Sequence, residues 1–419
     1  MAWVEKIVSL VPNLSRRAAL LAGLALPAAP ATAQQNRQAP RPAPQPRREP
    51  PPPVGPPANT LLGPLDTPAK QALVMDFDTE TVLLEKNADE RMAPSSMSKL
   101  MTLYIVFSRL KEGKLQLTSE LPVTTRARNM GGSRMFVEVG TTISVENLIR
   151  GVIVHSGNDA CVVLAEGISG SEQQFSDLAT QTGRRIGLTN SNFRNATGWP
   201  DPEHRMTCRD LARLAKRLIL DFPEYYRYFN DRTFTWNNIT QENRNPLLNR
   251  TPGTDGLKTG HTEEGGYGLV ASTKRGDRRL LLVVNGLATM RARAEEPDRL
   301  MEWGFREFEN IVLFRTAEVV EEVPVWLGTR PSVPLIFGGR EGRDLMVTLP
   351  RSWRNNLVAK VRYAAPIDAP VLKGQELGRL EISGAGVSPM SLPLLAGADV
   401  EKVGFLPRIP RVIGRWMGS

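Results

Sequence analysis

Apolar residues in the region 66–311 follow a strand-like pattern at both ends and a helix-like pattern between them. Residues 72–84 hold two short apolar runs around a polar turn, which predicts a β-hairpin. Two longer apolar runs, 266–274 and 279–287, flank Gly276-Asp277, a dipeptide typical of tight turns between paired strands. The region is therefore expected to begin and end with antiparallel strands.

Between these hairpins the apolar residues recur at the three- and four-residue spacing of helices. Strands at both ends with helices between them predict an α+β fold, in which an antiparallel sheet carries a helical lobe. The predicted helices are 96–112, 144–154, 158–168, 171–186 and 207–220, with a last amphipathic helix at 292–309.

The pattern changes again over residues 317–395. Short Val-rich runs alternate there with Gly- and Pro-containing turns, which predicts a small all-β domain. This region holds no cluster of reactive side chains, so we expect it to serve as a spacer or a docking module.

Residues 1–33 have the order of features found in an export signal. Basic residues precede the short apolar run 18–26, and Ala31-Thr32-Ala33 resembles a cleavage site. The apolar run is too short for a permanent membrane anchor. Ser15-Arg16-Arg17 is compatible with the twin-arginine route, and the general secretory route stays equally open.

Two further segments lie outside the predicted domains. Residues 34–65 begin with a run that has ten prolines between Pro40 and Pro57, which predicts an extended, disordered arm. Residues 400–419 place apolar side chains on one face of a short helix and basic ones on the other, and Trp416 lies near the end. Such a segment suits the plane of a membrane interface, although the same face could pack on the β-domain.

The chain is basic, with 53 Lys and Arg residues against 44 Asp and Glu and a net charge of +9. The basic residues are dispersed and are not interleaved with aromatic ones, so a nucleic-acid partner is not expected. An exported basic protein would meet anionic lipid and anionic wall polymer instead. The two cysteines, Cys161 and Cys208, permit one disulfide, but no spacing pattern indicates it.

Three short motifs carry the candidate chemistry. Ser96-Met97-Ser98-Lys99, Ser156-Gly157-Asn158 and Lys258-Thr259-Gly260 occur in the order used by serine acyl-transferases that bind penicillin. Each alone has an ordinary reading as a helix cap, a turn or a loop. Ser108-Arg109-Leu110-Lys111 repeats the first pattern by chance, so the conjunction of all three motifs carries the prediction.

The residue types fit nucleophilic catalysis. Ser96 and Lys99 are three residues apart and share one face of a helix, so a neutral Lys99 could take the proton of the Ser96 hydroxyl. Burial and a second cation, Lys258, would lower the pKa of Lys99. Ser156 could pass a proton to the leaving amine, and Asn158 could bond the peptide group of a substrate.

The third motif is read as the start of a strand that binds substrate. Lys258 and Thr259 offer a charge and a hydroxyl to a substrate carboxylate. Gly260 would let the substrate backbone approach. The chain has only three histidines, no metallopeptidase motif and no phosphate-binding loop, so neither a metal nor a cofactor is expected.

With these motifs, the chain resembles the low-molecular-mass penicillin-binding proteins that are serine-type D-alanyl-D-alanine carboxypeptidases. The likeness extends to Lys258-Thr259-Gly260-His261-Thr262 and to Gly266-Tyr267-Gly268-Leu269-Val270-Ala271-Ser272, and it covers residues 66–419. It implies a β-lactamase/transpeptidase-like domain followed by a small all-β domain.

The resemblance also implies the reaction and its location. Such enzymes remove the terminal D-Ala from peptidoglycan pentapeptide stems in the periplasm, attached to the inner-membrane surface, and serve cell-wall synthesis and cell shape. β-Lactam antibiotics acylate the same serine. The backbone N–H groups of Ser96 and His261 would form the oxyanion hole, and Arg293, or failing it Arg291, would hold the terminal carboxylate.

Other activities stay open on the sequence alone. A β-lactamase shares the acylation machinery, but no Glu-x-x-Leu-Asn segment lies between Asn158 and Lys258 to activate a deacylating water. A D,D-endopeptidase would use the same residues. A penicillin-binding cell-wall scaffold without activity is the non-enzymatic alternative.

Overall fold

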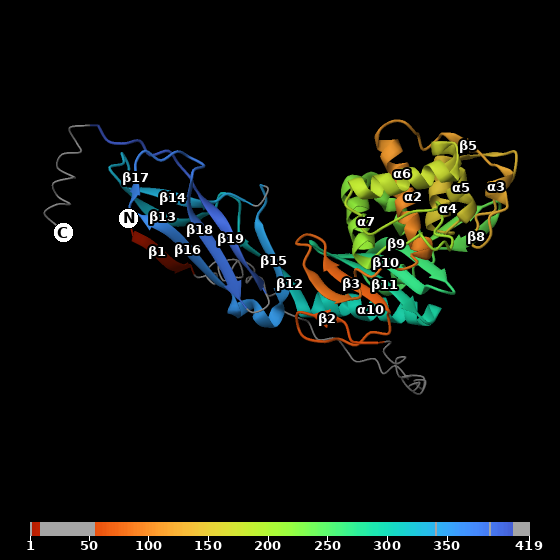
Figure 1. Ribbon diagram of the computed structural model, residues 1–419, viewed down its shortest axis with the longest axis horizontal. Coiled ribbons are helices and arrows are strands. Elements are labelled where there is room, and N and C mark those ends of the chain that lie inside the picture. Colours follow the sequence, from red (N-terminus) through yellow and green to blue (C-terminus); the bar gives the residue numbers. More distant parts are fainter. Residues whose placement is uncertain (1, 9–54, 340–341, 385–386, 405–419) are drawn as a thin grey trace, which may run out of the picture. The chain divides into compact units, whose positions relative to one another are not determined.

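The protein is described here by a computed structural model that covers residues 2–8, 55–339, 342–384 and 387–404 (Figure 1). The chain forms two compact units. One is Pro51–Glu309, and the other combines Asn310–Ser419 with the N-terminal residues. The predicted leader beyond residue 8, most of the Pro-rich arm and the amphipathic tail from residue 405 lie outside the described residues.

The first unit is built on a six-stranded antiparallel sheet with the order β2-β4-β3-β11-β10-β9. Both predicted hairpins are confirmed, since β3 pairs with β4 and β10 pairs with β11. The strands are β2 (Asn59–Thr60), β3 (Gln71–Asp76), β4 (Val82–Lys86), β9 (Thr254–Thr262), β10 (Gly266–Arg275) and β11 (Arg278–Leu287).

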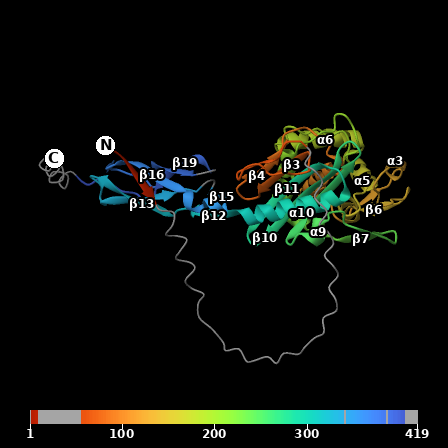
Figure 2. The ribbon, with the colours of Figure 1, turned by 90° about the horizontal axis from the view of Figure 1, so that it is seen from below.

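Alternate residues of the central strand β11 serve two different cores, because successive side chains in a strand point to opposite faces. Leu281 and Val283 pack with the helical lobe. Leu280 and Leu282 pack with α10 (Met290–Glu307), which lies across the other face (Figures 1 and 2). The sheet is therefore covered on both sides, which explains why its strands are apolar throughout.

The helical lobe follows the predicted order, and its helices start and end close to the predicted residues. Ser or Thr side chains cap the N-termini of α4, α6 and α7. The helices are η1 (Ser95–Ser98), α2 (Lys99–Lys111), α3 (Thr125–Arg128), α4 (Val145–Ile153), α5 (Asn158–Ser169), α6 (Glu172–Arg185), α7 (Cys208–Asp221), α8 (Pro223–Tyr226), η2 (Arg227–Asn230) and α9 (Leu247–Arg250).

Two small strand pairs at the edge of this lobe were not predicted. They are too short and too polar to give a clear alternating pattern, and their sheets have two strands each. The pairs are β5 (Glu120–Pro122) with β6 (Thr142–Ser144) and β7 (Thr233–Trp236) with β8 (Ile239–Glu242).

The second unit is all-β, as predicted for residues 317–395. A seven-stranded sheet has the order β1-β16-β18-β19-β14-β13-β17, and β12 pairs with β15. A single short helix, η3 (Arg351–Asn356), is found among its described residues. The strands are β1 (Ala2–Val8), β12 (Phe308–Phe314), β13 (Val319–Trp326), β14 (Ser332–Phe337), β15 (Leu345–Pro350), β16 (Val358–Ala365), β17 (Ile367–Asp368), β18 (Glu376–Gly384) and β19 (Val387–Ala396).

Strand β1 was not predicted, because it falls within the expected export signal. It forms an edge of the seven-stranded sheet and pairs antiparallel with β16 along its whole length. The carboxylate of Glu5 accepts hydrogen bonds from Lys360 (2.6 Å) and Arg362 (2.9 Å), and Lys6 forms an ion pair with Glu321. These contacts are exposed, so the backbone ladder is the main attachment.

The predicted boundary between the arm and the folded region, at residue 65, is wrong. The backbone N–H and carbonyl of Ala58 both bond to Leu65, and Asn59–Thr60 adds a strand to the edge of the sheet. The folded unit thus starts before residue 66. Among the helices of the described residues, none combines the length and the apolar character needed to cross a bilayer.

Replacing Leu300 should test the packing of α10 on the sheet. Leu300 is fully buried, so Leu300→Ala is expected to lower the free energy of unfolding by about 2–5 kcal/mol. Leu220, on α7, is 52% exposed, and Leu220→Ala should change it by less than about 0.5 kcal/mol. Urea unfolding followed by circular dichroism measures both, and equal effects would contradict the assigned core.

Candidate active site

Ser96 and Lys99 meet where the 3-10 helix η1 passes into α2. Lys99 is fully buried, and its Nζ lies 2.7 Å from Ser96 Oγ. The same nitrogen donates to Asn158 Oδ1 (2.7 Å) and to the carbonyl oxygen of Thr197 (2.6 Å). Three segments far apart in sequence therefore fix the position of one amino group.

Burial is the main reason that the pKa of Lys99 falls to about 8, because the charged form loses its hydration. Cys161 and Asp159 oppose this shift, and the Arg244 guanidinium adds to it. Lys258, the predicted second cation, also interacts with Lys99 through its charge, and Arg244 is a further cation that was not predicted. A neutral amine at Lys99 is accessible near neutral pH.

Ser156 and Lys258 form a second serine–lysine pair. Lys258, in β9, is buried and donates from Nζ to Ser156 Oγ at 2.9 Å. Burial lowers the pKa of Lys258 well below its ordinary value, and the charges of Lys99 and Arg244 lower it further. Ser156 lies just before α5 with φ of 57°, in the left-handed region, so the turn holds its hydroxyl in a constrained position.

Asn158 connects Lys99 to a neighbouring loop. Its Oδ1 accepts from Lys99, and its Nδ2 donates to the carbonyl oxygen of Gly131 at 2.7 Å. One hydrogen on Nδ2 is left for a substrate, since an amide nitrogen carries two. The adjacent Asp159 carboxylate accepts from the backbone N–H groups of Met135, Phe136 and Val137 and so fixes this loop.

The motif Lys258-Thr259-Gly260 lies within β9, not at its start as predicted. Gly260 is required by close packing of the strand on η1, because a Cβ there would lie 2.3 Å from Ser95 Oγ. This observed reason differs from the predicted one, an approach of substrate. His261 follows at the surface, and its ring lies 3.9 Å from that of Tyr267.

A cleft of about 740 Å³ is lined by three of the predicted site residues, Ser96, Asn158 and His261. Lys99, Ser156, Lys258, Thr259, Gly260 and Arg293 are not among the lining residues. Trp199 and Arg244 also line the cleft and were not predicted, since a single Trp or Arg in a loop has no diagnostic spacing. The remaining lining residues are Gly132, Ser133, Thr197, Gly198, Pro200, Thr262, Glu263 and Glu264.

The two arginines considered for the substrate carboxylate have different surroundings. Arg293 is buried, its guanidinium lies 5.4 Å from the ring centre of Tyr267, and its Nε has no hydrogen-bond partner among the described residues. Arg291 is exposed and forms an ion pair with Glu295 on the next turn of α10. Arg293 is thus a buried cation with an unused donor, whereas Arg291 is already paired at the surface.

Cys161 and Cys208 are both buried free thiols, so the disulfide that the sequence permitted is not formed. Burial raises the pKa of the Cys161 thiol to about 12 and raises that of Cys208 further. Both are therefore protonated and poor nucleophiles. Within the described ranges, His, Cys, Asp and Glu form no group of three or more that could hold a metal ion.

Comparison with known proteins gives matches along most of the chain. A family model described as D-alanyl-D-alanine carboxypeptidase matches residues 58–289, and one described as the C-terminal domain of penicillin-binding protein 5 matches residues 308–402. The D-alanyl-D-alanine carboxypeptidase DacC of Escherichia coli is 38% identical over 363 residues, which is 84% of this chain and 90% of that protein.

Solved structures agree with these matches. Penicillin-binding protein 5 of Haemophilus influenzae superposes with a TM-score of 0.70 and 36% identity, over 80% of this chain and 98% of that one. Penicillin-binding protein D2 of Listeria monocytogenes, in its ampicillin-bound form, gives a TM-score of 0.53 and 28% identity, over 57% of this chain and 97% of that one. The α+β fold class, with its transpeptidase-like domain and small all-β domain, is confirmed.

The pH dependence of penicillin acylation should report the protonation of Lys99. Acylation needs the neutral amine, so its rate should rise with pH to a midpoint near 8 and fall about tenfold per pH unit well below it. Arg244→Gln removes a nearby cation and should move the midpoint to higher pH. A flat profile between pH 6 and 9 would exclude Lys99 as the base.

Proposed function

This chain belongs to the family of serine-type D-alanyl-D-alanine carboxypeptidases, and we propose that Ser96 and Lys99 carry its bond-breaking step. The protein is accordingly a hydrolase that acts on D-alanyl-D-alanine termini. The observation that supports our assignment of the residues is the 2.7 Å contact between Ser96 Oγ and the buried Lys99 Nζ.

In the first step, the neutral Lys99 amine takes the hydroxyl proton of Ser96. The freed Oγ attacks the carbonyl carbon between the two terminal D-Ala residues and forms a tetrahedral oxyanion. The backbone N–H groups of Ser96 and His261 would donate to this oxyanion. Asn158 would orient the substrate peptide through its remaining N–H.

Collapse of the oxyanion breaks the peptide bond and releases the terminal D-Ala. Its amine takes a proton through the Ser156 hydroxyl, and the Lys258 ammonium, which contacts Ser156 Oγ, can replace that proton. A water molecule then attacks the acyl-enzyme. Before this step the proton that Lys99 took from Ser96 passes to Lys258, which restores the neutral amine of Lys99 and the ammonium of Lys258. Lys99 then takes a proton from the attacking water and passes it to Ser96 Oγ, so that Ser96 leaves as the hydroxyl.

The substrate carboxylate would lie against the β9 side of the cleft. Thr259 offers a hydroxyl, and Lys258 and Arg293 supply positive charge. Arg244 adds a further cation along the cleft wall. The unpartnered Nε of Arg293 supports its role, because a buried guanidinium donor normally has an acceptor.

β-Lactam antibiotics would acylate Ser96 by the same first step. Opening of the ring leaves the departing nitrogen attached to the adduct, so it cannot diffuse away as D-Ala does. The adduct would therefore last. The ampicillin-bound form of penicillin-binding protein D2 from Listeria monocytogenes supports binding of this class of inhibitor.

We further propose that the chain is exported and cleaved after Ala33, and that the enzyme acts in the periplasm as a peripheral protein of the inner membrane. The order of charged, apolar and small residues in 1–33 supports export. The basic amphipathic pattern of residues 400–419 supports attachment to anionic lipid.

Release of D-Ala from a peptide ending in Lys-D-Ala-D-Ala tests the reaction. Ser96→Ala should lower kcat by about 10⁴-fold or more, because it removes the oxygen that forms the acyl-enzyme. Ser108→Ala, in the exposed copy of the same Ser-x-x-Lys pattern, is the matched control and should retain full activity. Fast penicillin turnover without D-Ala release would indicate a β-lactamase, and slow turnover would indicate an endopeptidase or a scaffold.

Removal of residues 405–419 tests the membrane contact. The full chain should sediment with vesicles that contain anionic lipid, and the shortened chain should stay in solution with its D-Ala release unchanged. High salt should weaken the binding of the full chain, because the electrostatic part of the attraction is screened. Equal sedimentation of the two chains would contradict a membrane role for the tail.

A further inference from the structure

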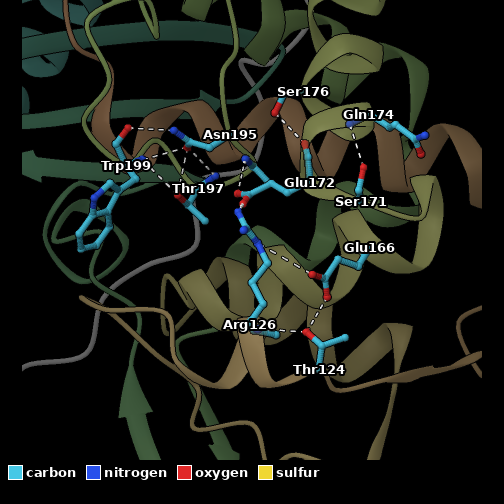
Figure 3. A network of polar contacts seen from close by, with 12 residues as sticks. Thr124, Arg126, Glu166, Ser171, Glu172, Gln174, Ser176, Asn195, Thr197 and Trp199 are labelled. Carbon is cyan, nitrogen blue, oxygen red and sulfur yellow. Dashed lines mark hydrogen bonds and ion pairs between the residues drawn. The ribbon is translucent and has the colours of Figure 1, made fainter.

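A network of polar contacts surrounds Glu172 (Figure 3), a residue with no part in the reaction steps described above. Glu172 is the first residue of α6, and its side chain is buried. One carboxylate oxygen accepts from the Arg126 guanidinium, and the other accepts from the backbone N–H of Ala196 at 3.1 Å. The carboxylate is thus neutralised on one side and holds a loop on the other.

That loop, residues 195–199, is closed by the side chain of Asn195 (Figure 3). Asn195 Oδ1 accepts from the backbone N–H groups of Thr197, Gly198 and Trp199, at 3.1, 2.8 and 3.0 Å. Its Nδ2 donates back to the carbonyl oxygen of Trp199 at 3.0 Å. Because these four hydrogen bonds lie within the loop, the loop should behave as a rigid unit.

The loop is also fixed from the side of α2. Thr102 Oγ1 donates to the carbonyl oxygen of Ala196 at 2.7 Å, and Lys99 Nζ donates to that of Thr197 at 2.6 Å. Gly198 has φ of 79°, and a Cβ there would lie 1.9 Å from the carbonyl oxygen of Ser95. The loop therefore lies directly against the residues that present the nucleophile.

Trp199, the last residue of this loop, forms part of the cleft wall. Its indole is 46% exposed and lines the cleft. It packs over Gly131 and Gly132, since a Cβ on either would lie 3.1 or 3.2 Å from the indole ring. A substrate peptide entering the cleft would meet this ring.

We propose that Glu172 is a positioning residue for the reaction, which acts through Ala196 on both Lys99 and Trp199. The proposal rests on the assignment of Lys99 as the base. A neutral amine has two N–H groups and one lone pair. If Asn158 Oδ1 and the Thr197 carbonyl accept the two hydrogens, the lone pair points to the Ser96 hydroxyl.

Glu172 does not act as a base in this account, because Arg126 and Ala196 occupy its two oxygens. The charged groups around Lys99 are Asp159, Arg244 and Lys258. Glu172 is hydrogen-bonded to Arg126 and Ala196, and its charge also acts on the neutral Cys161 thiol beside Lys99. Through Ala196 it positions the Thr197 carbonyl, which accepts a hydrogen from Lys99, and Trp199, which lines the cleft.

Glu172→Gln tests this role with little change of shape. Only one oxygen remains, so either Arg126 or the Ala196 N–H faces an NH₂ group. The kcat for D-Ala release and the rate of penicillin acylation should both fall about tenfold or more. Both rates are divided by the concentration of enzyme that penicillin labels, so that misfolded protein is not counted. The pH midpoint of acylation should move lower, because the ammonium form of Lys99 loses a well-placed acceptor.

Glu166→Gln is the matched control. Glu166 also lies near Arg126, at 3.9 Å, and accepts from Thr124 Oγ1 at 2.7 Å, but no hydrogen bond joins it to the described loop 195–199. Its replacement should leave rates and pH midpoint unchanged, even if it lowers the melting temperature. Thr102→Val, which removes the donor to Ala196 from the α2 side, should act in the same direction as Glu172→Gln.

The proposal is overturned if Glu172→Gln and Glu166→Gln have equal rates per labelled molecule, or if Glu172→Gln lowers only the melting temperature. If Glu172→Gln does not fold, wild-type rates in Thr102→Val would overturn it as well. Absence of D-Ala release by the unaltered enzyme would instead count against the proposed function. Penicillin acylation would then still test the positioning.

Discussion

The burial of one amino group, that of Lys99, constrains the whole first unit. An ammonium ion without water is costly, and it is tolerated only where its hydrogens have acceptors. Here the acceptors come from η1, from α5 and from a loop before α7. The sheet, the helical lobe and the glycines that permit close packing all serve to bring these three segments within hydrogen-bond distance of one nitrogen.

The sequence predicted the parts of the site that depend on local spacing. Ser96 and Lys99 meet because residues three apart share a helical face, and the paired strands β10 and β11 follow from strong apolar runs around a Gly-Asp turn. The α+β order and the all-β second unit were also correct. The contact between Ser156 and Lys258 was not predicted. The correctly predicted features are encoded either in short segments or in the joint presence of three motifs.

Contacts between distant single residues could not be predicted in this way. Nothing in the sequence near Glu172 or Trp199 indicates that either lies close to Lys99, since loop paths are set by tertiary packing. Gly260 was assigned to substrate approach, whereas its neighbour is the Ser95 side chain. Strand β1 was hidden because its residues also satisfy the charge pattern of an export signal. Composition likewise assigned Ala58 to the disordered arm, but Ala58 is buried and its backbone bonds to Leu65.

If the leader is cleaved, the loss of strand β1 changes the edge of the seven-stranded sheet. Removal of residues 1–33 would take a strand from the seven-stranded sheet and leave β16 as its new edge, with unpaired N–H and carbonyl groups. Lys360 would lose the carboxylate of Glu5, while Arg362 would keep Glu381. Without Glu5, Lys360 would place a positive side chain at the bare edge and so oppose its pairing with an identical edge.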